Sequence, residues 1–256
     1  MTITRRLGGL AHRWALFAFV VVAWELVTRS VDDLLFPPPS EIARATADTW
    51  FSGKFAEDVL PSLGRMLGGW AIAAVIGIAL GVALGRSRVA MDYAGPAMHF
   101  FRAIPPPLLV PFFLVTMGLD GMHTGTIVFG AVWPILLNSV DGARSVDAVK
   151  IDTARTFRLS RAQWMVGVVL PAASPKIFAG LRVSLSIALI LMVISELVGA
   201  ANGIGRELKD AQESYQNPAM WTWIVLLGLL GYLFNSMLLI AERHLLGWRS
   251  APSRTA

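Results

Sequence analysis

The sequence of 256 residues contains no cysteine, which excludes a disulfide framework and a thiolate metal site. Charged residues are also scarce, at 15%, whereas soluble domains carry about a quarter. Three stretches, 66–85, 121–140 and 214–241, contain no Asp, Glu, Lys or Arg at all. About 20 apolar residues cross a bilayer, and lipid offers the backbone no hydrogen-bond partners, so such stretches must form helices. The sequence therefore predicts an all-α membrane protein.

Motifs for nucleotide, metal or covalent chemistry are missing as well. No G-x-x-x-x-G-K-[ST] loop, H-E-x-x-H helix or G-x-S-x-G elbow occurs. The four histidines, at positions 12, 99, 123 and 244, do not have the spacing of metal ligands. We therefore expect no cofactor, no metal and no catalytic residue, and an energy source outside this chain.

Basic residues are numerous, but their positions argue against nucleic acid as a partner. The net charge is +5 and the pI is near 10.1, yet Lys and Arg lie between the hydrophobic stretches. With the N-terminus inside, 16 Lys and Arg residues lie on the inner side and six on the outer side. The positive-inside rule then places both termini and the loop 141–176 in the cytoplasm, as in a multi-pass protein of a bacterial inner membrane. The six predicted transmembrane helices are at about 13–30, 63–85, 96–118, 123–140, 177–199 and 220–241.

The first part of the chain holds one span and an outer loop. The basic N-terminus and the apolar run 14–24 resemble a signal peptide, but no cleavage site follows, so we expect a retained anchor. In the outer loop, Ser40 is expected to cap a short surface helix over 42–51. The predicted parts are 1–62, with this anchor and loop, a five-helix core over 63–241, and a cytoplasmic tail over 242–256.

Small residues mark one face of the second predicted span. Gly77, Gly81 and Gly85 recur at four-residue spacing, so a neighbouring backbone can approach closely there. We expect this face to pack within the bundle, and contact with a second copy of the chain is the alternative.

Two features are candidates for a translocation path. Glu196 follows the charge-free run 183–195, and a charge at membrane depth is costly. A path and a plain interfacial position are equally compatible with this location. Pro105, Pro106 and Pro107 interrupt the third predicted span, and such a bend is tolerated where it lines a cavity or packs on protein.

The segment 152–171 is a charged hairpin between long hydrophobic runs. Arg155, Arg158 and Arg161 recur every third residue beside Phe157 and Leu159. The segment turns apolar from Trp164, and a proline at 171 is expected to end it. This pattern predicts a docking surface for another protein.

The spacing in this hairpin resembles a family signature. Asp152-Thr153-Ala154, position 158, Val168 and Leu170-Pro171 are similar to the E-A-A, G, I and L-P positions in the membrane subunits of binding-protein-dependent ABC importers. Within that family the chain is most similar to the nitrate, sulfonate and taurine group, which includes the aliphatic sulfonate permeases. The other similar segments are 36–40, 102–106, 134–136, 170–175 and 180–182, together with Glu196, so the resemblance covers nearly the whole chain.

The resemblance implies an importer-permease (MetI-like) bundle with a cytoplasmic coupling helix over about 152–160. The implied partners are a dimer of cytoplasmic ABC ATPase subunits, a second permease copy, an extracytoplasmic solute-binding protein and membrane lipid. Arg158 stands where the family has glycine, so the turn is expected to differ, with Arg158 either paired to an acidic residue of the ATPase or facing solvent. The implied coupling residues are Asp152, Thr153, Ala154, Arg155, Thr156, Phe157, Arg158, Leu159, Arg161, Leu170 and Pro171.

Two other function classes remain open from the sequence. An ion-coupled secondary transporter would need paired intramembrane acids and inverted repeats, whereas only isolated Glu25 and Glu196 are present. A membrane scaffold or assembly factor would bind an ATPase without moving a solute. For an importer, a small organosulfonate or similar anion is the preferred solute, and nitrate and pyrimidine or other vitamin-precursor ligands stay open.

Overall fold

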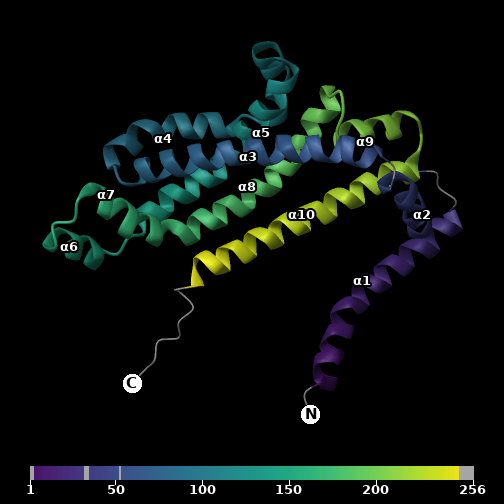
Figure 1. Ribbon diagram of the computed structural model, residues 1–256, viewed down its shortest axis with the longest axis horizontal. Helices are drawn as coiled ribbons and strands as arrows, with labels where there is room; N and C mark the ends of the chain where they lie inside the picture. The colour runs from purple at the N-terminus through teal and green to yellow at the C-terminus, as the bar shows by residue number, and fades with distance from the viewer. Residues whose placement is uncertain (1–2, 32–34, 52, 248–256) are drawn as a thin grey trace.

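The computed structural model describes residues 3–31, 35–51 and 53–247, with side chains described from residue 15 onward, residue 54 excepted. Within these ranges every regular element is a helix, as the all-α prediction requires (Figure 1). The predicted tail over 242–256 is described only as far as residue 247, and the side chains of the N-terminal arginines lie outside the described residues. The elements are α1 (Ile3–Val31), α2 (Pro39–Trp50), α3 (Lys54–Gly85), α4 (Arg88–Ala103), the 3-10 helix η1 (Pro106–Leu109), α5 (Val110–Arg144), α6 (Ala148–Thr156), α7 (Arg161–Trp164), the π-helix η2 (Met165–Val169), α8 (Leu170–Gly199), α9 (Ile204–Glu213) and α10 (Asn217–Leu245).

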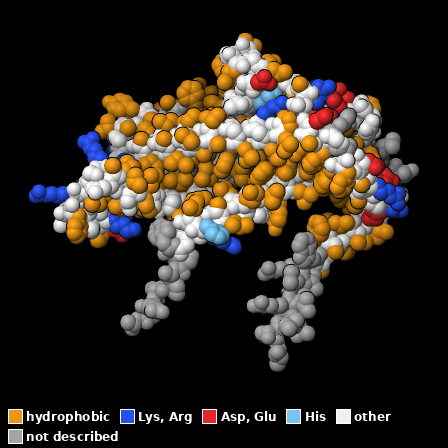
Figure 2. Space-filling view, in the orientation of Figure 1, with side chains coloured by type: hydrophobic (Ala, Val, Ile, Leu, Met, Phe, Trp, Pro, Cys, Tyr) orange, Lys and Arg blue, Asp and Glu red, His pale blue; other side chains and the backbone are white. Residues whose placement is uncertain are grey.

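Among the described residues, four helical stretches are long and apolar enough to cross a membrane, and each contains one predicted span. Figure 2 shows a broad hydrophobic band over the middle of the molecule, with charged side chains gathered toward both ends. The predicted span at 13–30 lies in α1, whose side chains are described only in part, so the total of six spans stays a prediction. The four stretches are Phe55–Gly85, Pro106–Arg144, Arg161–Gly199 and Asn217–Leu245.

The region predicted as the third span is interrupted twice. Helix α4 ends at Ala103, and the proline run follows as an extended residue and a short 3-10 helix, as expected from prolines that cannot donate a backbone hydrogen bond. The chain then reverses at Gly118, where φ is 73° and only glycine is free of strain. The rings of Phe113 and Phe129 lie 6.5 Å apart, whereas a straight helix would separate them by about 24 Å. The first turns of α5 therefore form a helical hairpin with the rest of α5, which the sequence did not predict.

The centre of the bundle is α5, which packs against α3 on one side and α8 on the other. A Cβ added at Gly81 would lie 2.5 Å from the carbonyl oxygen of Leu136, and one at Gly180 would lie 2.8 Å from that of Pro134. Both distances are shorter than Cβ contacts allow, so only glycine permits the helices to come this close. This confirms that the glycine face of α3 packs within the bundle.

The outer loop folds differently from the prediction. Ser40 is not the N-cap of α2, because the helix begins at Pro39 and Pro38 is the capping residue. Ser40 instead donates its backbone N–H to Oε2 of Glu25 at 3.0 Å and its hydroxyl to Oε1 at 2.8 Å. Arg29 also donates to Glu25, at 2.6 Å. A carboxylate of α1 therefore caps the N-terminus of α2, where it complements the helix dipole.

The two ends of the bundle carry different connections (Figure 1). Helices α6 and α7 lie at one end, and α2 and α9 lie at the other. Helix α1 runs away from the bundle, and near its C-terminal end Trp24 meets Trp221 of α10 edge to face at 5.2 Å. The predicted docking hairpin is therefore separated from the outer loops by the length of the spans.

Candidate functional site

The predicted docking hairpin contains a short helix, α6, that is shifted from the predicted range. The side chain of Asp147 accepts a hydrogen bond from the backbone N–H of Val149 at 2.7 Å, so the helix begins at Ala148 rather than near Asp152. It ends at Thr156 rather than Ser160. The shift leaves Phe157 and Leu159 outside the helix, in the turn that follows it.

Arg158 occupies the turn in the left-handed conformation, with φ at 50°. Its N–H donates to the carbonyl of Arg155 at 3.0 Å, and the N–H of Leu159 donates to that of Ala154 at 3.0 Å. These two bonds form a Schellman motif, the helix ending in which glycine is most common. Arginine thus adopts the left-handed conformation that glycine provides most easily, although a left-handed residue other than glycine costs about 1–2 kcal/mol.

The second half of the hairpin starts with a capping box. The hydroxyl of Ser160 accepts from the N–H of Gln163 at 3.3 Å, and Oε1 of Gln163 accepts from the N–H of Ser160 at 2.9 Å. Two backbone N–H groups at the start of α7 thus have hydrogen-bond partners, which fixes the direction in which the chain continues into α8.

The proline at 171 does not end the helix, contrary to the prediction. Helix α7 continues through the π-helix Met165–Val169 into α8, and the stretch Arg161–Gly199 is one long span. Pro171 lies in the first turn of α8, where the extra residue of the π-helix has already changed the hydrogen-bond pattern. The helix therefore continues past this proline, as it also does past Pro175 within α8.

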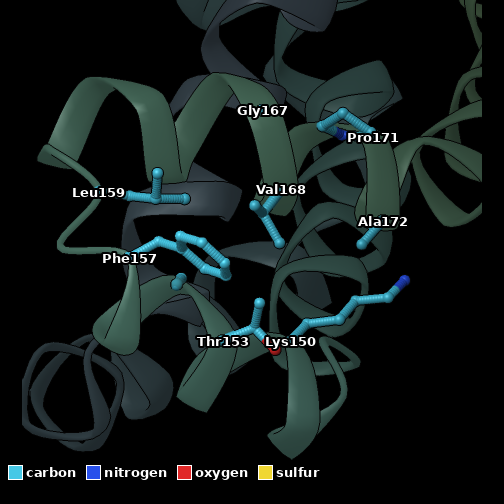
Figure 3. Close-up of a pocket in the computed structure, with 9 residues that line it drawn as sticks. Lys150, Thr153, Phe157, Leu159, Gly167, Val168, Pro171 and Ala172 are labelled. Carbon is cyan, nitrogen blue, oxygen red and sulfur yellow. The ribbon is translucent and has the colours of Figure 1, made fainter.

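The hairpin and the start of α8 enclose an apolar groove of ≈ 370 Å³ (Figure 3). Phe157 lies in the groove beside Leu159 and opposite Val168 (Figure 3), and its side chain is 74% exposed. A phenylalanine this exposed forgoes most of the about 1.5–3 kcal/mol that full burial of its side chain would contribute. The lining residues are Lys150, Thr153, Ala154, Phe157, Leu159, Gly167, Val168, Pro171 and Ala172.

A second groove, of ≈ 510 Å³, is basic and brings the three predicted arginines together. Arg155 also pairs with Asp152 at 3.5 Å, but both side chains are about three-quarters exposed, so the pair adds little stability. The hydroxyl of Thr156 is used within α6, where it donates to the carbonyl of residue 152 at 2.9 Å. The lining residues are Arg86, Ile151, Ala154, Arg155, Arg158, Leu159, Arg161 and Trp164.

Arg86 and Trp164 were not predicted as members of this site. The guanidinium of Arg86 lies over the ring of Trp164, 5.5 Å from its centroid, and donates to the carbonyl of Ala143 at 3.2 Å. The signal in the sequence that could have identified Arg86 is its position directly after a charge-free stretch.

At the opposite end, Glu196 is completely buried in a polar cluster. Its carboxylate accepts from the hydroxyl of Ser62 at 2.8 and 2.9 Å, from Arg65 at 2.9 Å and from the N–H of Gly205 at 2.9 Å. A buried carboxylate with three donors is well compensated, so the cluster joins α3 and α8 firmly. Neither Ser62 nor Arg65 was predicted, although a charge at the start of a predicted span was a signal.

The cluster also fixes the turn between α8 and α9. Arg65 donates to the carbonyl and side-chain oxygens of Asn202 at 2.9 and 2.7 Å. The N–H of Gly203, whose φ is 134°, donates to Asp58 at 3.0 Å, and that of Ile204 donates to Ser62 at 2.9 Å. These contacts give Glu196 a structural role, and its part in a translocation path stays a prediction.

The proline run lies against a different helix from the one that Glu196 faces. A Cβ added at Gly130 of α5 would lie 3.1 Å from Cγ of Pro106, so the break packs closely on α5. Pro106 and Pro107 are half-buried, and Pro105 is exposed. The proline run therefore contacts α5, whereas Glu196, the other predicted part of the path, contacts α3. Among the described side chains, no group of three His, Asp or Glu residues lies close enough to hold a metal ion.

Known proteins are similar to this chain over most of its length. The family model described as the binding-protein-dependent transport system inner membrane component matches residues 73–247. A probable ABC transporter permease protein of Brucella abortus is 30% identical over 245 residues, which cover 95% of this chain and 98% of that protein. The taurine transport system permease protein TauC of Escherichia coli is 25% identical over 253 residues, which cover 96% and 90%.

A solved structure shares the fold. A chain of the inward-facing MetNI methionine ABC transporter superposes with a TM-score of 0.65 at 21% identity, over 77% of this chain and 96% of that chain. This likeness concerns the fold alone, and it agrees with the helical bundle described above. Because the family model matches more than half of the chain, this protein belongs to the binding-protein-dependent transport system inner membrane components, the permease subunits of ABC importers.

Proposed function

We propose that this permease forms the translocation path for a small organic anion and is driven by a separate ATPase that docks on the α6–α7 hairpin. The exposed ring of Phe157 in its apolar groove is the observation that carries this proposal. A soluble surface loop gains nothing from an aromatic ring at 74% exposure, whereas a docking loop buries it in its partner.

The hairpin has the features of a rigid docking element. The Schellman turn and the capping box fix the backbone on both sides of Phe157, so little conformational entropy is lost on binding. Arg155 and Arg158 lie in the neighbouring basic groove, which Leu159 also lines, and suit carboxylates on the partner. The excess of Lys and Arg on this side supports a cytoplasmic location for the hairpin and for both termini.

Coupling follows from the continuity of the helix behind the hairpin. The stretch Arg161–Gly199 runs without interruption from α7 to the cluster around Glu196. A movement of the hairpin with its ATPase would therefore tilt this span and change which side of the membrane the bundle opens toward. A second permease copy would complete the path, with Pro105, Pro106, Pro107 and Glu196 as its candidate residues, and an extracytoplasmic binding protein would deliver the solute.

The preferred solute is an organosulfonate. TauC, which is similar over 96% of this chain, carries taurine in its name, and taurine is an aminosulfonate. Uptake of labelled taurine into cells that express the complete transporter should be lowered by excess alkanesulfonate and not by nitrate or a pyrimidine. Inhibition by nitrate or the pyrimidine alone would replace the sulfonate by that ligand.

The docking assignment is tested by charge substitutions in the groove. Phe157→Asp and Leu159→Asp should abolish co-purification with the cognate ATPase, because each places an unpaired carboxylate in an apolar contact. Val149→Asp is the matched control, since Val149 is 71% exposed on the preceding helix α6 but does not line the groove. Normal assembly and transport by the Phe157→Asp variant would disprove docking at this groove.

A further inference from the structure

The basic groove lies at the ends of two of the stretches that are long and apolar enough to cross a membrane. Arg86 is the first residue after the span Phe55–Gly85, and Arg161 is the first residue of the span Arg161–Gly199. Arg155 and Arg158 complete the set; Arg155 pairs with Asp152 at 3.5 Å, and Asp152 is not among the lining residues. The guanidinium groups of Arg86, Arg158 and Arg161 form no ion pair with a described residue, and like charges around one open groove repel one another unless an anion lies between them.

Arg86 is held in place at the membrane end of this groove. It is half-buried, its guanidinium stacks on Trp164, and it donates to the carbonyl of Ala143. An arginine carries five N–H donors in a planar fork, so this one bond to a described residue leaves donors for a ligand. A planar fork binds phosphate oxygens in pairs, and its fixed position lowers the entropic cost of binding.

Exposed apolar and aromatic side chains follow the groove residues Arg86 and Trp164 closely along the chain. Val89, three residues after Arg86, is 65% exposed, and Tyr93 is 83% exposed. Val166, two residues after Trp164, is 65% exposed. Figure 2 shows blue Lys and Arg side chains at this end, next to the hydrophobic band. A ligand with an anionic head and apolar chains therefore finds both of its partners here.

We propose that this groove is a binding site for the phosphodiester headgroup of an anionic phospholipid from the adjoining leaflet. Arg86 and Arg161 bind the phosphate, Trp164 lies at the level of the headgroup, and the acyl chains run along the exposed apolar side chains. The site goes beyond ATPase docking, because Arg86 and Trp164 belong to the span ends and not to α6. Binding therefore takes place without the ATPase.

The test measures lipid retention by the purified full-length chain without its ATPase. The chain is reconstituted in phosphatidylcholine discs that contain phosphatidylglycerol, and the phosphatidylglycerol that remains after partial delipidation is counted by native mass spectrometry. Each arginine near a charged surface contributes about five-fold in affinity, so Arg86→Gln and Arg161→Gln should each lower retention about five-fold. Arg243→Gln is the matched control, because Arg243 is exposed on the same side but does not line the groove.

The outcomes separate the sources of the anion. Retention that is resistant to millimolar inorganic phosphate and falls only in the groove variants supports the lipid. Equal retention by Arg86→Gln and Arg243→Gln overturns the proposal, as does displacement by inorganic phosphate alone. Full displacement of the lipid by added ATPase also overturns it, since the groove would then belong to the protein contact.

Discussion

Replacing Glu196 by glutamine is expected to weaken the tertiary structure and not only the transport rate. The carboxylate is completely buried and receives hydrogen bonds from Ser62, Arg65 and Gly205. Glutamine keeps the shape of the side chain, but its amide nitrogen is a donor. Donors face both carboxylate oxygens. In either orientation, the amide nitrogen of glutamine would therefore face a donor, and a hydrogen bond to that position would be lost.

The size of the effect follows from this geometry. Breaking a buried ion pair by removing one partner costs about 3–5 kcal/mol, since the remaining charge is left uncompensated. Arg65 is 19% exposed and keeps both bonds to Asn202, so the cost should lie near the lower end, at about 3 kcal/mol. At that size the change in the free energy of unfolding is easily measured.

Equilibrium unfolding of the purified chain in mixed micelles, followed by tryptophan fluorescence, provides the assay. Glu213→Gln is the control, because Glu213 is 66% exposed at the end of α9 and its contact with Lys209 is 3.9 Å long. That change should stay within about 0.5 kcal/mol. A loss of less than 1 kcal/mol in the Glu196→Gln variant, together with lowered uptake, would refute the structural role and favour a residue of the translocation path.

Three further features of the fold are tested by substitution in the same unfolding assay. Arg158→Gly should stabilise the chain by about 1 kcal/mol because it removes the strain of the left-handed conformation. Arg155→Gly, inside α6, should destabilise the chain by a similar amount. If the two substitutions changed the free energy of unfolding in the same direction, the left-handed turn at Arg158 would be contradicted. Gly81→Ala should cost about 1–3 kcal/mol through overpacking, whereas Gly64→Ala, where a Cβ meets nothing within 4 Å, should be neutral or slightly stabilising. Glu25→Ala should cost about 0.5–2 kcal/mol and speed amide hydrogen exchange at the start of α2, and unchanged exchange would exclude the cap.

Much of the fold could be predicted because the relevant signals are local. A charge-free run of about 20 residues cannot form anything but a helix in lipid, and four of the predicted spans lie within the four membrane-crossing stretches. The glycine spacing on α3 likewise predicted a close helix contact within the bundle. Both predictions depend only on residues that are neighbours along one helix.

The predictions that were wrong concern contacts and backbone geometry that the local sequence does not specify. Ser40 was predicted to cap its own helix, but a carboxylate of α1 supplies a stronger, charged acceptor from 15 positions away. A proline at 171 was predicted to stop a helix, but a π-helix before it changes the register. The reversal at Gly118 was missed because a single glycine within an apolar run has no distinct pattern.

The sequence by itself determined that this protein is helical, that it lies in a membrane and that it resembles the importer permeases, because transfer costs and motif spacing are properties of adjacent residues. Only the tertiary structure decided what surrounds the key side chains. Ser62 and Glu196 are 134 positions apart, and they meet because glycine contacts bring α3 and α8 close to α5. Arg86 likewise joins the arginines of the hairpin only after the bundle has folded. The physical reason is that hydrogen bonds and ion pairs act over a few ångströms, so their partners are set by helix packing and not by order along the chain.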